Sequence, residues 1–176
     1  MSDSIVQPFP TPGPQIREAL AILDIVVGGD PETIAMLGDL EDLPRPWDPS
    51  TCPARLRLQI WSWCAQVASW INSQYIWRPA AMIPACWPAH THLAIELPAL
   101  ACQRLAAQEA FDVSALEEWQ RYTLPTFLDR MNGRLGESGC KDGRHVDWPG
   151  AARHVTHVRE DEARRRLDWF LDDTGL

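Results

Sequence analysis

Two cysteine–histidine pairs are the residues whose types and spacing most directly suggest chemistry. Three residues separate Cys86 from His90, and four separate Cys140 from His145. Two thiolates and two imidazoles form a ligand set that zinc binds as a tetrahedron. The 49 residues between the pairs suffice for two helices that return as a hairpin. We therefore predict a structural zinc site at Cys86, His90, Cys140 and His145, joining the loop before one helix to the loop after its neighbour.

Other interpretations of these residues are open at the level of sequence. Cysteine is often buried for packing alone, and a chain with five cysteines and five histidines brings some together by chance. His92 is an alternative ligand to His90. His154 and His157, three positions apart on one predicted helix face, could join or replace the other ligands. The simpler interpretation of these two is solvent-exposed histidines on a charged helix.

A thiol hydrolase using Cys140, His145 and Asp147 is a further alternative, but such partners usually meet through the fold and not within eight residues of sequence. The sequence has no glycine-rich phosphate loop after a strand, no serine at a nucleophile elbow and no set of inward-facing carboxylates. We therefore predict no catalytic residue and no cofactor other than zinc, and we expect the protein not to be an enzyme.

Helices must position these residues, because apolar side chains recur with helical spacing and no period-2 strand pattern is present. The strongest helical pattern covers residues 54–74, with one apolar stripe formed by Leu56, Ile60, Trp63, Val67 and Trp70. Further helices are expected at residues 15–28, from residue 31, at 87–110, at 114–135 and from Pro149 to Phe170. The predicted fold class is mainly α, a compact domain of five to seven helices with proline-rich loops and no substantial sheet.

Proline and charge patterns divide the chain into five segments. Residues 1–14 are a proline-rich arm that we expect to be flexible, residues 15–43 an acidic helical segment, and residues 44–53 a proline-rich linker. Residues 54–148 are predicted to be a tryptophan-rich helical core domain, and residues 149–176 a charged C-terminal helix.

Three local features predict how these segments pack. Trp47 is expected to hold the linker against the core, because a large ring in a loop is usually buried. The tryptophans at positions 61, 63, 70 and 77 are expected to pack in the core, since no basic residues surround them for binding bases. Ser114 and Glu117 form a capping-box pattern that predicts a helix start.

The charge distribution argues against a general nucleic-acid binder, because attraction to phosphate requires a positive field. The net charge is −8, and residues 1–50 carry −7 of it. The C-terminal helix nevertheless holds a cluster that we predict to contact a partner, a protein rather than nucleic acid: Arg164, Arg165, Arg166, Trp169 and Phe170. The alternative is a DNA-binding accessory protein that uses the arginines of residues 153–166.

Location follows from what the sequence lacks. No apolar stretch approaches the roughly 18 residues of a membrane span, and Met1–Gln7 show no secretory signal. Cysteines in a chain without an export signal are expected to be free or metal-bound in the reducing cytosol. We therefore expect a cytoplasmic protein with no membrane partner.

A resemblance to a known family rests on the residues around both pairs. They are Cys86-Trp87-Pro88-Ala89-His90, then Leu97, Leu100, Leu116, Trp119 and Leu128, and finally Cys140 and His145. Over residues 60–146 this pattern resembles an uncharacterised family encoded on actinobacterial plasmids and integrative elements. The resemblance implies the same four Cys and His positions and an accessory role in the transfer or maintenance of mobile DNA. The predicted function is a non-enzymatic helical interaction or accessory module, stabilised by zinc.

Overall fold

The computed structural model describes residues 4–136, 140 and 144–175, and these residues contain helices and no strand. The prediction of a mainly α fold is therefore confirmed. Two compact units follow one another along the chain, Met1–Arg144 and His145–Leu176. The first unit includes the arm, the acidic segment and the linker together with the tryptophan-rich helices.

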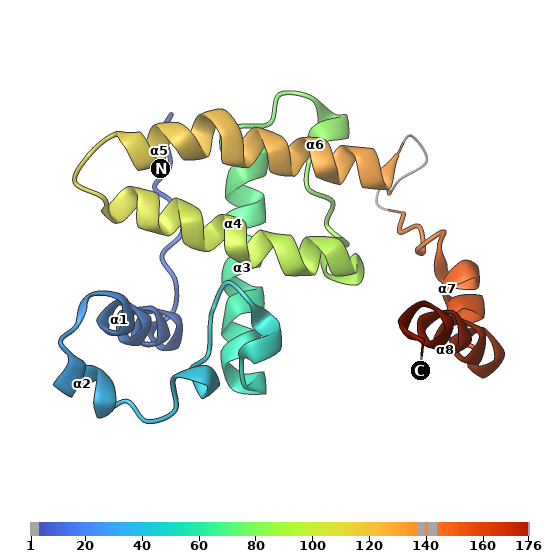
Figure 1. The fold of residues 1–176 in the computed structure, drawn as a ribbon. Coiled ribbons are helices and arrows are strands. Elements are labelled where there is room, and N and C mark those ends of the chain that lie inside the picture. Colours follow the sequence, from blue (N-terminus) through green and yellow to red (C-terminus); the bar gives the residue numbers. More distant parts are fainter. Residues whose placement is uncertain (1–3, 137–139, 141–143, 176) are drawn as a thin grey trace. The chain divides into compact units, whose positions relative to one another are not determined.

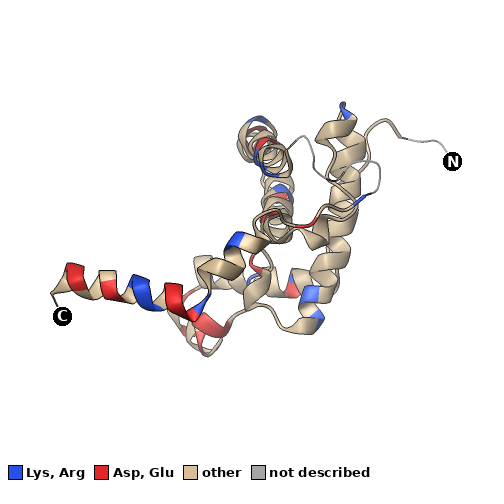
Figure 2. Ribbon diagram, turned by 90° about the vertical axis from the view of Figure 1, so that its right-hand side faces the viewer, with Lys and Arg blue, Asp and Glu red and all other residues tan. Residues whose placement is uncertain are grey.

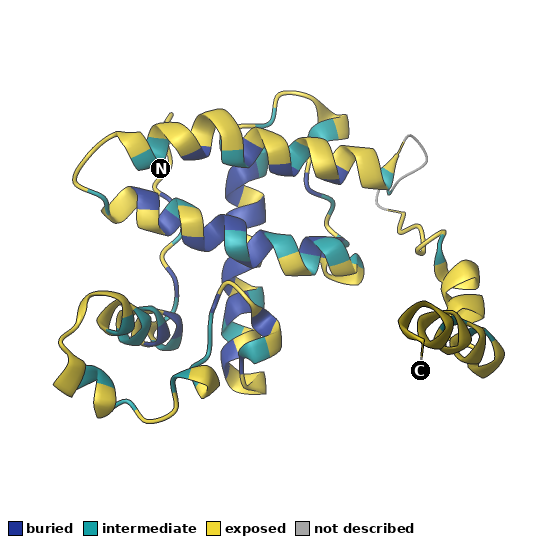
Figure 3. Ribbon diagram, in the orientation of Figure 1, coloured by how far each residue is buried: buried dark blue, intermediate teal, exposed yellow. Residues whose placement is uncertain are grey.

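The helix α3 (Ala54–Gln74) is the centre of the first unit (Figure 1). It contacts α1 (Pro14–Gly28) and α4 (Thr91–Glu109). Its apolar stripe is buried as predicted, with Ile60, Trp63 and Val67 at most 1% exposed. Figure 3 shows buried residues along α3 and on α4. Pro98 lies inside α4 and is itself buried in this core.

The second half of the core is a nearly continuous helical segment beside α4 (Figure 1). It consists of α5 (Ser114–Glu118), a π-helical turn (Trp119–Thr123) and α6 (Leu124–Leu135). Pro125 has no N–H to donate, and the π turn directly before it accommodates the interrupted hydrogen-bond ladder. The Trp119 indole donates to the carbonyl of Leu100 at 3.2 Å, which ties the turn to α4.

The arm that the sequence predicts to be flexible is instead bound to α3, in part. Phe9 is 6% exposed and makes edge contacts with the rings of Trp63 and Trp70. The Trp63 indole donates to the carbonyl of Pro10 at 2.9 Å, and the Trp70 indole donates to that of Gln7 at 3.0 Å. Trp63 and Trp70 are seven positions apart on α3, which corresponds to a rise of about 10.5 Å. The two carbonyls that they bind are three positions apart in the arm, which corresponds to roughly 9.3 Å in a polyproline conformation. The two tryptophans therefore match the repeat of the extended arm.

Two predictions about tryptophans are wrong. Trp47 is 40% exposed, and the linker is held instead by Pro46 and Pro49, both buried. Trp77 is 95% exposed, because it lies beyond the C-terminal end of α3 and has left the helical stripe. Short 3-10 helices punctuate the loops at Leu40–Asp42, Pro49–Thr51, Pro79–Ala81 and Trp87–Ala89.

Aspartate carboxylates accept hydrogen bonds from backbone N–H groups at the starts of several helices. Asp30 caps α2 (Pro31–Ala35), its carboxylate accepting from the backbone of Glu32 and Thr33. The helix start predicted at Ser114 is confirmed, but the N-cap residue is Val113 and not Ser114, and the Asp112 carboxylate accepts from the backbone N–H of Ser114 at 2.8 Å. An aspartate two positions before a helix turn performs the same role.

The second unit holds two helices where the sequence predicts one. They are α7 (Ala151–His157) and α8 (Glu160–Thr174), and Arg159 between them is extended, with ψ of 145°. Three acidic residues in the first turn of α8 favour a new helix N-terminus there, because negative charge stabilises that end of a helix. Among the described residues, no helix has the length and apolar character required to cross a membrane.

Candidate metal centre

Cys86 and His90 are positioned by a loop that is anchored on both sides. Before Cys86, the Asn72 side chain exchanges two hydrogen bonds with the backbone of Ile83, at 2.9 and 2.8 Å. After it, Trp87 is 5% exposed and makes an edge contact with the ring of Trp61, with the ring centroids 6.0 Å apart. His90 is the N-cap residue of α4, one position before the first turn in which the sequence pattern predicts it. These anchors fix the two side chains four positions apart on one short turn.

Cys140 reaches the same place because α6 lies along α4 and ends near its N-terminal end (Figure 1). Glu96 of α4 holds the two helices together through ion pairs with Arg130 and Arg134 of α6. The helix ends at Gly136, whose φ of 62° favours glycine. The chain then passes to Cys140.

The four predicted ligand residues lie together. Ligand atoms of Cys86, His90, Cys140 and His145 all lie within 4.8 Å of one another. His90 Nε2 is 3.5 Å from Cys86 Sγ and 3.1 Å from Cys140 Sγ. Zn–S and Zn–N bonds of ordinary length place S and N about 3.6 Å apart in a tetrahedron. The cluster thus has the composition and spacing to bind a metal ion.

The surroundings of the cluster are partly shielded from solvent. Cys86, His90 and Cys140 are half-buried and His145 is exposed. Burial raises the pKa of the Cys86 thiol, and the adjacent Cys140 raises it further. A bound cation would reverse this effect by favouring the thiolates. Asp147 Oδ1 lies 3.3 Å from His145 Nε2, the type of carboxylate partner that orients metal-binding histidines.

The alternative histidine ligands lie outside the cluster. The ring centroid of His92 is 5.9 Å from that of His90, and burial lowers the pKa of His92. His154 and His157 lie on α7, both exposed, with ring centroids 6.5 Å apart. None of the three belongs to the group of four residues.

The thiol-hydrolase alternative also gains proximity from the structure, since Cys140 approaches His145 and His145 contacts Asp147. The Cys140 sulfur, however, also contacts His90 Nε2 at 3.1 Å. A thiol shared between two imidazoles and a second thiol matches a metal ligand better than a nucleophile served by one base.

The other three cysteines belong to the apolar core. Burial raises the pKa of Cys102 to about 12, and it also raises the pKa values of Cys52 and Cys64. All three are at most 9% exposed. Their role is packing, and they are chemically distinct from the cluster thiols.

Two groups of the first unit were not predicted from the sequence, and one of them positions the site. The bridge from Glu96 to both arginines of α6 has a weak sequence signal, the spacing of Arg130 and Arg134 by one helical turn. The other is Arg104, whose guanidinium lies 5.1 Å from the ring centre of Phe9 and 5.6 Å from that of Trp119. No local pattern signals this cation among aromatic rings, because its partners come from distant segments.

The predicted partner-contacting residues all lie on α8. Trp169 and Phe170 are 61% and 62% exposed. Arg165 pairs with Glu162 at 3.1 Å, and Arg166 donates to the carbonyl of His157 at 2.9 Å. These contacts lie within the second unit and involve the arginines, not the exposed rings of Trp169 and Phe170.

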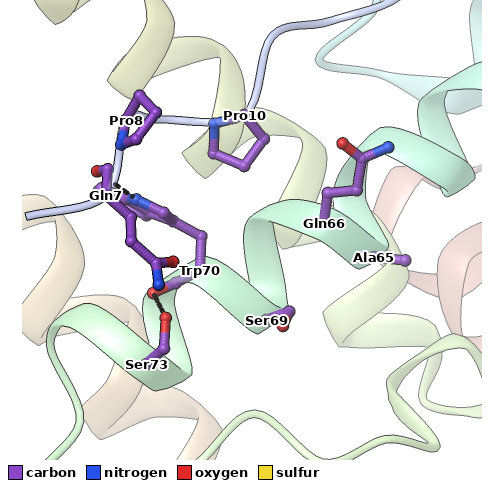
Figure 4. A pocket seen from close by; sticks show the side chains of 8 residues that line it. All are labelled: Gln7, Pro8, Pro10, Ala65, Gln66, Ser69, Trp70 and Ser73. Atoms are coloured by element: carbon purple, nitrogen blue, oxygen red, sulfur yellow. Dashed lines mark hydrogen bonds between the residues drawn. The ribbon is translucent and has the colours of Figure 1, made fainter. Parts of the chain in front are cut away.

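A shallow groove of about 450 Å³ lies between the arm and α3 (Figure 4). Its lining contains amide, hydroxyl, proline and indole groups and no acidic, basic or thiol side chain: Gln7, Pro8, Pro10, Ala65, Gln66, Ser69, Trp70 and Ser73. The groove therefore offers hydrogen bonds and apolar contact, and its lining holds no basic side chain that could activate the hydroxyls of Ser69 and Ser73.

Comparison of the chain with protein-family models, with curated proteins and with solved structures finds no match in any of the three.

Proposed function

We propose that this protein is a non-enzymatic helical interaction module whose core is held by a structural zinc ion at Cys86, His90, Cys140 and His145. The observation that carries the proposal is the convergence of four ligand atoms within 4.8 Å. Two of them come from residues that precede α4, and two come from residues that follow α6. Two thiolates and two imidazoles favour zinc over calcium or magnesium, which take oxygen ligands.

The role proposed for zinc is structural because four protein ligands complete its tetrahedron. Catalytic zinc sites keep one position open for water or substrate. An ion bound here would join the turn before α4 to the chain after α6. The ion would thus fix the end of the hairpin that is opposite the connection between α4 and α5.

The accessory part of the proposal rests on two further points. The resemblance of residues 60–146 to an uncharacterised protein family encoded on actinobacterial plasmids and integrative elements supports a role in the transfer or maintenance of mobile DNA. The exposed apolar side chains of α8 support contact with a macromolecule, since such side chains commonly form interfaces. The net charge of −8 favours a protein partner over nucleic acid.

Elemental analysis of tag-free protein tests the zinc site. We expect about one zinc per chain in the native protein and a large loss in Cys140→Ser, with no loss in the matched control His154→Gln, which changes an exposed histidine outside the cluster. Cobalt substitution should give the spectrum of a tetrahedral thiolate site. Absence of metal in native protein, or equal metal content in Cys140→Ser, would refute the zinc site.

A duplex-DNA titration tests the nature of the partner. We expect no binding even at low salt, because the chain is acidic. Tight binding with a steep salt dependence would replace the interaction role with DNA binding through the arginines of residues 153–166.

A further inference from the structure

The helix α8 exposes an apolar face with a regular spacing. Leu167 is 53% exposed, Phe170 62% and Leu171 38%. These positions differ by three and four residues, so they lie on one side of the helix. Ala163 and Thr174 extend the same side by one turn at each end. The face thus has the pattern of a short helix–helix seam.

Charges beside this face alternate along the helix (Figure 2). The first turn is acidic, Arg164 to Arg166 form a basic turn, and Asp172 and Asp173 end the helix. Arg166 and Asp173 are seven positions apart and therefore border the face on the same side. The helix carries opposite charges at the two ends of one apolar seam.

This arrangement is complementary to itself when two copies run antiparallel. If Leu167 packs opposite Phe170 of a second copy, heptad geometry sets Arg166 opposite Asp173 of that copy, and two-fold symmetry makes each contact twice. A parallel arrangement would instead set the basic turn against a basic turn and acidic ends against acidic ends. Arg166 uses one N–H for the carbonyl of His157 and has others for the second copy.

We propose that α8 is a self-association surface through which two copies of this chain form an antiparallel helix pair. The core of the contact is Leu167 against Phe170, and its flanks are two Arg166–Asp173 ion pairs. The seam is short, so the dimer is weak and forms as protein concentration rises. It uses none of the four cluster residues and is independent of the zinc site.

Sedimentation of the full chain, from about 5 to about 500 μM and with and without added zinc, tests the proposal. We expect the wild type to shift from monomer to dimer across this range. Arg166→Asp sets two carboxylates against each other, and Asp173→Arg sets two guanidiniums, so each variant should stay monomeric. The double variant with both changes should dimerise again, because the ion pairs are restored in reverse.

Arg165→Asp is the matched control, since it changes the charge by the same amount on the opposite side of α8, and its dimerisation should equal that of the wild type. A wild type that stays monomeric at every concentration overturns the proposal. So does a double variant that fails to dimerise, or a control that dissociates as fully as Arg166→Asp. Circular dichroism confirms that each variant retains its helices.

Discussion

Removal of zinc should destabilise the first unit by an amount that follows from its chain topology. The metal would close a loop between His90 and Cys140, which lie 50 positions apart. The chain-entropy relation for a cross-link gives about 4 kcal/mol for a loop of this length. Unlike a zinc finger, this unit has a large apolar core of its own, so it should remain folded without the metal.

Thermal unfolding with and without a chelator measures this effect. About 4 kcal/mol corresponds to a fall in Tm of about 8 to 16 °C for a chain of this size. Cys140→Ser should melt at the lower temperature and should not respond to the chelator. His154→Gln should respond as the wild type does. A Tm that is unchanged by chelation in the wild type, or an equal response in Cys140→Ser, would refute the reasoning.

Three further predictions concern other parts of the first unit. With the metal chelated, a thiol reagent should label two cysteines of the native protein, Cys86 and Cys140, because these are only half-buried whereas Cys52, Cys64 and Cys102 are at most 9% exposed. Rapid labelling of a third thiol, detected by mass spectrometry, would contradict this. Burial acts to raise the pKa of Glu96, but its ion pairs with both arginines of α6 outweigh burial and lower it below the usual value of 4.5. The stabilisation is therefore present above pH 4.5 and is lost as the pH falls through the lowered pKa; Glu96→Gln should cost about 1 kcal/mol in urea unfolding at pH 7 and less at pH 3. Phe9→Ala should cost about 3 kcal/mol by removing a buried ring, whereas Trp77→Ala at an exposed position should cost under about 0.5 kcal/mol; equal costs in denaturant unfolding would show that the arm does not contribute to the core.

Local sequence patterns predicted much of the secondary structure. The helix at Ala54–Gln74 has the predicted bounds, because its apolar stripe, the proline before it and its length all agree. Pro31 at the first position of α2 likewise acts as predicted. The break between α7 and α8 was missed, since no proline or glycine stands at Arg159 to signal the end of a helix, although the backbone there is extended. Periodicity reports which side of a helix is apolar and is insensitive to one extended residue.

The sequence determined some properties of the candidate metal centre, and the tertiary structure determined others. The sequence by itself determined the ligand types, because the softness of thiolate and imidazole is a property of the residues. Only the tertiary structure decided that Cys140 meets Cys86 and His90, since this depends on α6 lying along α4 through Glu96 and the core. The tertiary structure also decided that the arm is bound, because the indoles of Trp63 and Trp70 donate to carbonyls that lie 53 and 63 positions away along the chain. Local propensities act over a few residues, whereas burial and metal coordination join segments that are distant along the chain.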